Sequence, residues 1–178
     1  MKKAKAKKKP EIGVGCLVVN PSGQIMLCKR LKPYGYGKLA LPGGHLEWQE
    51  TLEDCARREV LEESGIKLGE ILNLDHYTQE ITGTRHYITF YLIAPLPDGQ
   101  VPVRTEPKKH GEWKWYDPYD LPKHAWEPTK RLLRLCGERI EGAIRVYRWE
   151  AMKRHEARMH VEAVTKPSGR KGVRVTIG

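Results

Sequence analysis

Seven carboxylates fall within one short stretch, residues 43–66 (GGHLEWQETLEDCARREVLEESGI). Three of them, Glu59, Glu62 and Glu63, have the i, i+3 and i+4 spacing that places side chains on one face of a helix. Like charges at this spacing each destabilise an isolated helix by roughly 0.2–0.5 kcal/mol. A divalent cation offsets that repulsion, and Mg²⁺ prefers oxygen ligands together with substrate phosphates. The acidic face therefore indicates either a magnesium site or a solvated surface that pairs with lysines.

Residues next to the acidic face favour the metal-binding interpretation. Arg58 precedes Glu62 by four residues, the spacing at which the two side chains can pair on a helix. Gly43 and Gly44 precede the expected helix, and residues without a β-carbon let backbone amides approach an anion closely. The stretch thus combines carboxylates for a cation with a loop suited to phosphate.

These residues depend on a helix whose two ends are marked in the sequence. Thr51 is a suitable N-cap, with Asp54 three residues later as a variant of the capping box. Gly65 stands where a left-handed residue can end the helix. A second helical pattern covers residues 128–164 and is interrupted by Gly137 and Gly142. Strands are expected as a hairpin over 12–31 and at 39–41, 70–79, 85–94 and 111–117. This order predicts a mixed α/β fold with a central sheet.

The spacing of the chemical residues resembles the Nudix box. Gly44, Glu50 and the segment 58–66 (REVLEESGI) match the signature G-x5-E-x7-R-E-U-x-E-E-x-G-U, in which U is aliphatic, at every fixed position. The resemblance implies the Nudix fold, an α/β/α sandwich around a mixed β-sheet. It also implies a hydrolase of nucleoside diphosphates linked to another group, with Mg²⁺ as cofactor and Mn²⁺ as its substitute.

The same resemblance implies roles for individual residues of the box. Glu59 and Glu63 are the leading metal ligands, and Glu62 is a supporting ligand. Arg58 orients the carboxylates, while Glu50 holds the loop–helix–loop together. Glu59, Glu62, Glu63 and Arg58 form the predicted catalytic group.

Segments outside the box resemble the MutT-type nucleoside triphosphate diphosphatases. The stretches GVGCLVVN, LPGGHLE and EPKKHGEWKWYD follow one another in the expected order. LPGGHLE and EPKK…EWKW are especially similar to the human MutT homologue that hydrolyses thiopurine nucleotides. The expected reaction converts a normal, oxidised or modified NTP or dNTP to the monophosphate and pyrophosphate. Two alternatives stay open: a hydrolase of capped or 5′-triphosphorylated RNA, and a module that binds nucleotide without hydrolysing it.

The resemblance also suggests residues beyond the box that hold the substrate and the metal. His45 occupies a position where the family often has a Lys or His near the phosphates. Lys29 and Arg30 could reach phosphate oxygens from the end of a strand, with an ordinary surface position as the equal alternative. Glu106 lies in a later loop that often supplies another acidic metal ligand, and Glu112 is the other candidate.

Trp126 departs from the MutT pattern. Bacterial MutT reads the purine edge with an Asn near the start of the last helix, and Trp126 occupies the corresponding position. An indole can stack on a base but has a single donor, so we expect broad NTP use or a pyrimidine preference in place of strong 8-oxoguanine selectivity. Tyr34 and Tyr36 could also line the base pocket. The predicted substrate-binding residues are Gly43, Gly44, His45, Lys29, Arg30 and Trp126.

Composition and charge indicate the domain organisation and the location of the protein. The 178 residues carry a net charge of +10, and residues 1–10 include six lysines and no acidic residue. We expect a disordered basic arm at 1–10, a Nudix hydrolase domain at 11–137, and a helical extension with a basic tail at 138–178. The basic ends either aid solubility or make weak, non-specific contacts with nucleic acid. Relatives suggest a homodimer. The lack of a membrane-length apolar run or a signal peptide predicts a cytoplasmic location.

Overall fold

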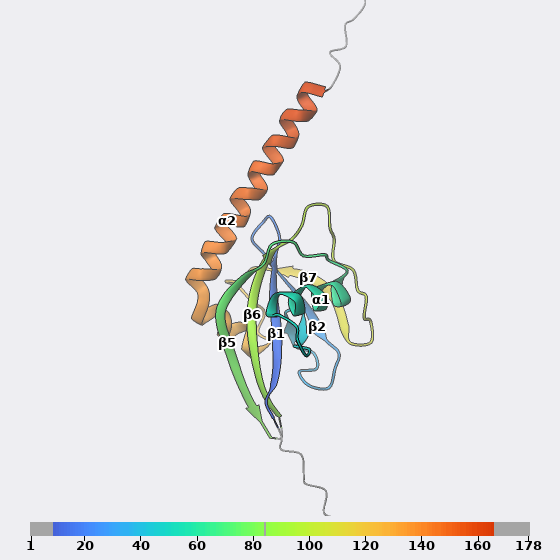
Figure 1. The fold of residues 1–178 in the computed structure, drawn as a ribbon, viewed down its shortest axis with the longest axis vertical. Coiled ribbons are helices and arrows are strands. Elements are labelled where there is room, and N and C mark those ends of the chain that lie inside the picture. Colours follow the sequence, from blue (N-terminus) through green and yellow to red (C-terminus); the bar gives the residue numbers. More distant parts are fainter. Residues whose placement is uncertain (1–8, 84, 166–178) are drawn as a thin grey trace, which may run out of the picture.

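A computed structural model describes residues 9–83 and 85–165, so residues 1–8 of the predicted arm at 1–10 and residues 166–178 of the predicted extension and tail lie outside the described residues. Within this part of the chain, a seven-stranded mixed sheet separates two helices, as Figure 1 shows. The helix α1 packs against one face and α2 against the other. This arrangement confirms the predicted α/β/α sandwich. The elements are β1 (Glu11–Val19), β2 (Ile25–Arg30), β3 (Leu39–Ala40), β4 (Gly43–His45), α1 (Leu52–Ser64), β5 (Leu72–Thr82), β6 (Arg85–Pro95), β7 (His110–Tyr116) and α2 (Glu127–Thr165).

The parallel pair of β1 and β6 forms the centre of the sheet. Its register runs from Glu11 opposite Tyr87 to Val19 opposite Pro95. The strand order is β3-β2-β1-β6-β5, and the remaining pairs are antiparallel, with β4 beside β1 and β7 beside β2. The sequence did not predict β4 as a strand. Its pairing with β1 places Gly43 and Gly44 in the sheet.

The strand β1 shows how one apolar run forms two cores. Val14, Cys16 and Val18 face α1, whereas Leu17 and Val19 face the side covered by α2. All five side chains are buried. A continuous apolar run of this kind is typical of a strand that is buried on both faces.

Both predicted ends of α1 are confirmed. The Thr51 hydroxyl accepts a hydrogen bond from the Asp54 amide at 3.1 Å, and Gly65 ends the helix in the left-handed region at φ 72°. Cys55, Ala56 and Val60 anchor the inner face of α1 on the sheet. The acidic residues of the next turn are thereby held beside β4.

The helix α2 covers nearly the predicted residues and contains one of the two predicted interruptions. It is kinked at Cys136, next to the predicted break at Gly137, whereas the predicted break at Gly142 is absent and the helix continues through that residue. The first turns of the predicted extension at 138–178 belong to the core through Ile140, Ala143, Ile144 and Tyr147. The C-terminal half of α2 projects beyond the sheet (Figure 1). In the described ranges, neither helix offers the uninterrupted apolar length that crossing a bilayer requires.

Candidate functional site

Arg58 ties the loop before α1 to the helix itself. Its Nε and Nη2 donate to the two carboxylate oxygens of Glu50 at 2.8 and 2.9 Å, a bidentate arrangement. Its Nη1 donates to Glu59 at 2.7 Å, and its Nη2 also reaches the His45 carbonyl at 3.0 Å. The hydrogen bonds from Arg58 lower the pKa of Glu50 to about 2. Glu50 therefore stays ionised and is occupied by Arg58, while Glu59 is held in a fixed orientation.

Glu63 lies deeper than the other acids of the box. Its side chain is 3% exposed, Oε2 accepts from the Gly43 amide at 3.0 Å, and Oε1 lies 3.2 Å from Nε2 of His110. Burial raises the pKa of Glu63 to about 8 and lowers the pKa of His110 to about 4. The two shifts agree that both groups are neutral near pH 7 when no cation is bound. A bound cation would ionise Glu63, because a nearby positive charge favours the carboxylate, and it would keep His110 neutral.

Glu106 and His110 complete a group of ligand atoms around Glu63. One ligand atom from each of these three residues lies within 4.8 Å of the others. Glu106 is in the loop before β7 and pairs with Lys109, whereas Glu112 is exposed on β7. Buried Nδ1 of His110 has no hydrogen-bond partner among the described residues. This geometry favours Glu106 over Glu112 as the additional acidic residue of the site.

The position of Glu59 explains why the box needs a glycine at Gly44. A β-carbon built on Gly44 would overlap the Glu59 carboxylate, which is 14% exposed. Gly44 pairs with Val14 in the sheet, so the backbone cannot easily move away. Glu62 differs from the other two acids because it is 57% exposed and lies 3.8 Å from Arg58. Two carboxylates of the box thus point inward, and the third lies at the rim.

The donor set suits a divalent cation. Glu59, Glu63 and Glu106 offer carboxylate oxygens, the ligands that Mg²⁺ and Mn²⁺ prefer. The neutral imidazole of His110 adds a nitrogen that borderline metals also accept. We call Glu59, Glu63 and Glu106, which lie behind Gly43 and Gly44, the acidic end of the site.

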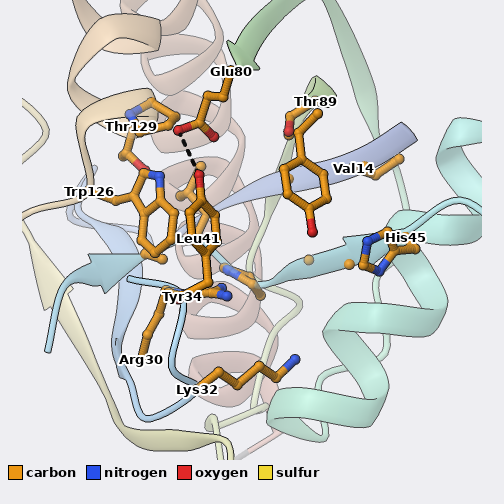
Figure 2. Close-up of a pocket in the computed structure, with 18 of the residues that line it drawn as sticks. Val14, Arg30, Lys32, Tyr34, Leu41, His45, Glu80, Thr89, Trp126 and Thr129 are labelled. Atoms are coloured by element: carbon orange, nitrogen blue, oxygen red, sulfur yellow. Dashed lines mark hydrogen bonds between the residues drawn. The ribbon is translucent and has the colours of Figure 1, made fainter. Parts of the chain in front are cut away.

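A cavity of about 420 Å³ opens in front of the two glycines. Gly43, Gly44 and His45 line one side of it, and Figure 2 shows His45 across the cavity from Trp126. We call Tyr34, Glu80 and Trp126, which line the far side, the aromatic end. The Tyr34 and Trp126 rings meet edge to face with their centroids 5.2 Å apart. Cavities of this size hold small-molecule ligands in many proteins.

The structure brings most of the predicted substrate-binding residues to this cavity. Arg30 lines it, and its guanidinium lies 4.5 Å from the centre of the Trp126 ring. Lys29 is exposed and does not belong to the lining, because successive side chains on a strand point to opposite faces. The Gly43 amide already donates to Glu63. His45 is exposed and pairs with Glu11 at 2.8 Å.

Sequence reasoning missed several residues of the site. Lys32, Glu80 and Tyr87 line the cavity, and His110 contacts Glu63. No local spacing in the sequence connects these residues to the box, so no motif could have identified them. Tyr34 lines the cavity, as the sequence suggested. Tyr36, the other suggested residue, is 66% exposed and lies outside the lining.

Comparisons with known proteins agree with this geometry. The NUDIX domain family matches residues 9–136. The ADP-ribose pyrophosphatase of Methanocaldococcus jannaschii is 30% identical over 116 residues, which cover 64% of this chain and 66% of that protein. The oxidized purine nucleoside triphosphate hydrolase of Danio rerio is 30% identical over 109 residues, covering 60% and 65%. The chain thus spans slightly less than two thirds of the length of these curated relatives.

A solved structure supports the same assignment. The MutT NUDIX hydrolase from Burkholderia pseudomallei is 30% identical and superimposes with a TM-score of 0.66. The match covers 71% of this chain and 98% of that one. Family match, fold and an intact box together establish that this chain belongs to the Nudix family.

Proposed function

We propose that this protein hydrolyses nucleoside triphosphates to the monophosphate and pyrophosphate, with Mg²⁺ as cofactor and Mn²⁺ as its substitute. The observation that carries the proposal is the position of the acidic end directly behind Gly43 and Gly44, which line the cavity. A nucleotide whose base lies at the aromatic end would extend its phosphates toward the carboxylates. Phosphoryl transfer depends mainly on such positioning and on charge neutralisation.

The residues of the site divide these tasks. Glu59, Glu63 and Glu106 would hold the cation, which supplies charge neutralisation of the phosphates and lowers the pKa of a bound water. Arg58 keeps Glu59 oriented through its hydrogen bond at 2.7 Å. One carboxylate of this set would accept the proton of the attacking water. Lys32 lines the cavity and its charge acts on Glu63, so it would bring positive charge to the phosphate chain.

A nucleotide panel with Mg²⁺ and pyrophosphate detection tests the proposal. Glu63→Gln preserves the shape of the side chain and removes its charge, so we expect kcat to fall roughly 100-fold or more. Glu106→Gln should also lower kcat, whereas Glu112→Gln, on the exposed side of β7, should leave it unchanged. Absence of turnover with every NTP and dNTP, or full turnover in Glu63→Gln, would refute the proposal.

The panel also separates the competing substrates. The name of the M. jannaschii relative favours ADP-ribose as a second candidate, and its hydrolysis would yield AMP and ribose phosphate without pyrophosphate. Thiopurine triphosphates test the predicted similarity to the human thiopurine-hydrolysing homologue. Triphosphorylated and capped RNA test the alternative that the basic residues of α2 motivate. Saturable nucleotide binding without turnover of any of these would indicate a binding module.

A further inference from the structure

Glu80 is a half-buried acid at the far side of the cavity from the Nudix box. It lies on β5, and its Oε1 accepts a hydrogen bond from the Tyr34 hydroxyl at 3.3 Å (Figure 2). The nearby Trp126 indole lowers the pKa of Glu80 and so favours its ionised form. None of the ion pairs found in the described ranges includes Glu80, although Arg30 lies close enough to influence it. A carboxylate of the cavity wall is therefore left without a paired cation.

This arrangement leaves hydrogen-bonding capacity for a ligand. Burial raises the pKa of Glu80, while the hydrogen bond from Tyr34 and the charge of Arg30 lower it. A partly desolvated carboxylate needs donors, because an unsatisfied polar group in such a place is costly. An ionised carboxyl group offers about four acceptor sites. Among the described residues, the hydrogen bond found to this carboxylate comes from Tyr34, so its remaining sites can accept hydrogen bonds from a molecule in the cavity.

We infer that Glu80 reads the base of the bound nucleotide and selects guanine, or another purine with an N1–H and a 2-amino group. The two oxygens of one carboxylate match two adjacent N–H donors. Guanine presents that pair on its Watson–Crick edge, whereas adenine and cytosine present one amino group beside an acceptor and uracil presents a single N–H between two acceptors. The inference deepens the proposed function, on which it depends for the assumption that a nucleotide occupies the cavity.

The surroundings of Glu80 suit a purine ring. Trp126 and Tyr34 provide aromatic surfaces next to the carboxylate, and base–aromatic stacking tolerates any base. Arg30 and Arg85 lie over these rings, 4.5 and 4.7 Å from their centres. Arginine commonly donates to the O6 and N7 acceptors of guanine. The aromatic end thus offers both hydrogen-bond donors, from the arginines, and a hydrogen-bond acceptor, the Glu80 carboxylate.

The direction of the bound nucleotide follows from the cavity. Figure 2 shows Glu80 and Trp126 at one side and His45 at the other. A base held by Glu80 therefore directs its phosphates toward His45 and the two glycines. In this arrangement the base is selected from β5, and Trp126 at the start of α2 only stacks. This inference predicts a guanine preference, whereas the sequence alone predicted broad NTP use or a pyrimidine preference.

GTP and ITP provide the sharpest test, since they differ only by the 2-amino group. We expect wild-type kcat/KM to favour GTP over ITP roughly ten-fold or more, the size expected for a hydrogen bond to a charged group. ATP and CTP should be poorer substrates than GTP. In Glu80→Gln the GTP/ITP ratio should fall toward one, because one oxygen is replaced by an amide donor. Glu70→Gln, an exposed acid outside the cavity, should retain the wild-type ratio.

Calorimetric binding of GMP and IMP separates this inference from the proposed function, because it needs no turnover. A preference for GMP that is lost in Glu80→Gln supports base reading by Glu80, even if no triphosphate is hydrolysed and the proposed reaction fails. Equal affinity of the wild-type protein for GMP and IMP overturns the inference without any variant. A preference that survives unchanged in Glu80→Gln also overturns it.

Discussion

The acidic and aromatic ends of the site differ in how the chain assembles them. At the acidic end, Glu59 and Glu63 come from one helix, which Arg58 ties to the loop before it, and only Glu106 comes from a distant loop. At the aromatic end, three side chains arrive from β5, from the loop after β2 and from the residue before α2. The acidic end is thus specified mainly by local spacing, whereas the aromatic end depends on the folded sheet.

The two ends also differ in the forces that hold them. Hydrogen bonds of 2.7–3.0 Å fix Arg58, Glu59 and Glu63. Ring contacts with centroids 5.2–5.9 Å apart hold Tyr34 against Trp126 and Tyr87. Directional hydrogen bonds suit side chains that must hold a cation and the scissile bond in fixed positions. Broad aromatic surfaces suit a base that must stack, so we expect the first end to control turnover and the second to control affinity.

Gly44→Ala should have the largest effect, because the new methyl group would displace the Glu59 carboxylate. We expect kcat to fall roughly 100-fold, the cost of misplacing a reacting group by about 1 Å. KM should change little, since the aromatic end is untouched. Steady-state kinetics with the best triphosphate measure both quantities.

Gly142→Ala is the matched control for that variant. A β-carbon on Gly142, within α2, meets no heavy atom within 4 Å. The Gly142→Ala variant should keep full activity, and its unfolding free energy should rise by about 0.5–1 kcal/mol because alanine is the better helix former. Equal kinetics for the two alanine variants would show that Glu59 does not need the space at Gly44.

Trp126→Ala should have a smaller effect, and on a different kinetic constant. Stacking of a base on an aromatic ring contributes about 1–3 kcal/mol, so we expect KM to rise roughly ten-fold. We expect kcat to stay within a few-fold of wild type, because the acidic end remains intact. Trp149→Ala, which removes a 57% exposed indole from α2 outside this cavity, should change neither constant. A collapse of kcat with normal KM would contradict the proposed division between the two ends.

The same difference explains what the sequence could predict. The caps of α1 and the acidic face depend on neighbours three or four residues apart, so local rules identified them. Glu80 hydrogen-bonds to Tyr34, 46 residues away in the chain. His110, the first residue of β7, contacts Glu63 near the end of α1. No local pattern encodes these two contacts.

Strand register and packing account for the remaining differences. Lys29 and Arg30 are adjacent on β2, so only one of them can face the cavity, and a shift of one residue would exchange them. Gly142 was expected to interrupt α2, but one glycine costs a helix only about 1 kcal/mol relative to alanine. Burial of Ile140, Ala143 and Ile144 on the sheet outweighs that cost.

The smallest predicted effect is a pH dependence of stability caused by Glu63 and His110. Its sign follows from the protons bound in each state. The pKa of Glu63 rises from 4.5 to about 8 on folding, and the pKa of His110 falls from 6.5 to about 4. Between pH 4.5 and 6.5 the two shifts cancel, because each state holds one proton on the pair. Between pH 6.5 and 8 only the folded state holds that proton, so the unfolding free energy falls as pH rises.

Urea unfolding of metal-free protein at pH 6.5, 7.2 and 8.0 measures this decline, which should total about 1–2 kcal/mol at 1.4 kcal/mol per pH unit. Glu63→Gln should remove the decline, since the glutamine carries no titrating proton. Glu112→Gln should preserve it, because that exposed side chain lies outside the pair. Stability that rises over this range, or a decline that persists in Glu63→Gln, would mean that the buried proton is not on Glu63. The acidic end would then carry a fixed negative charge even without metal, held by Arg58 and by the Gly43 amide.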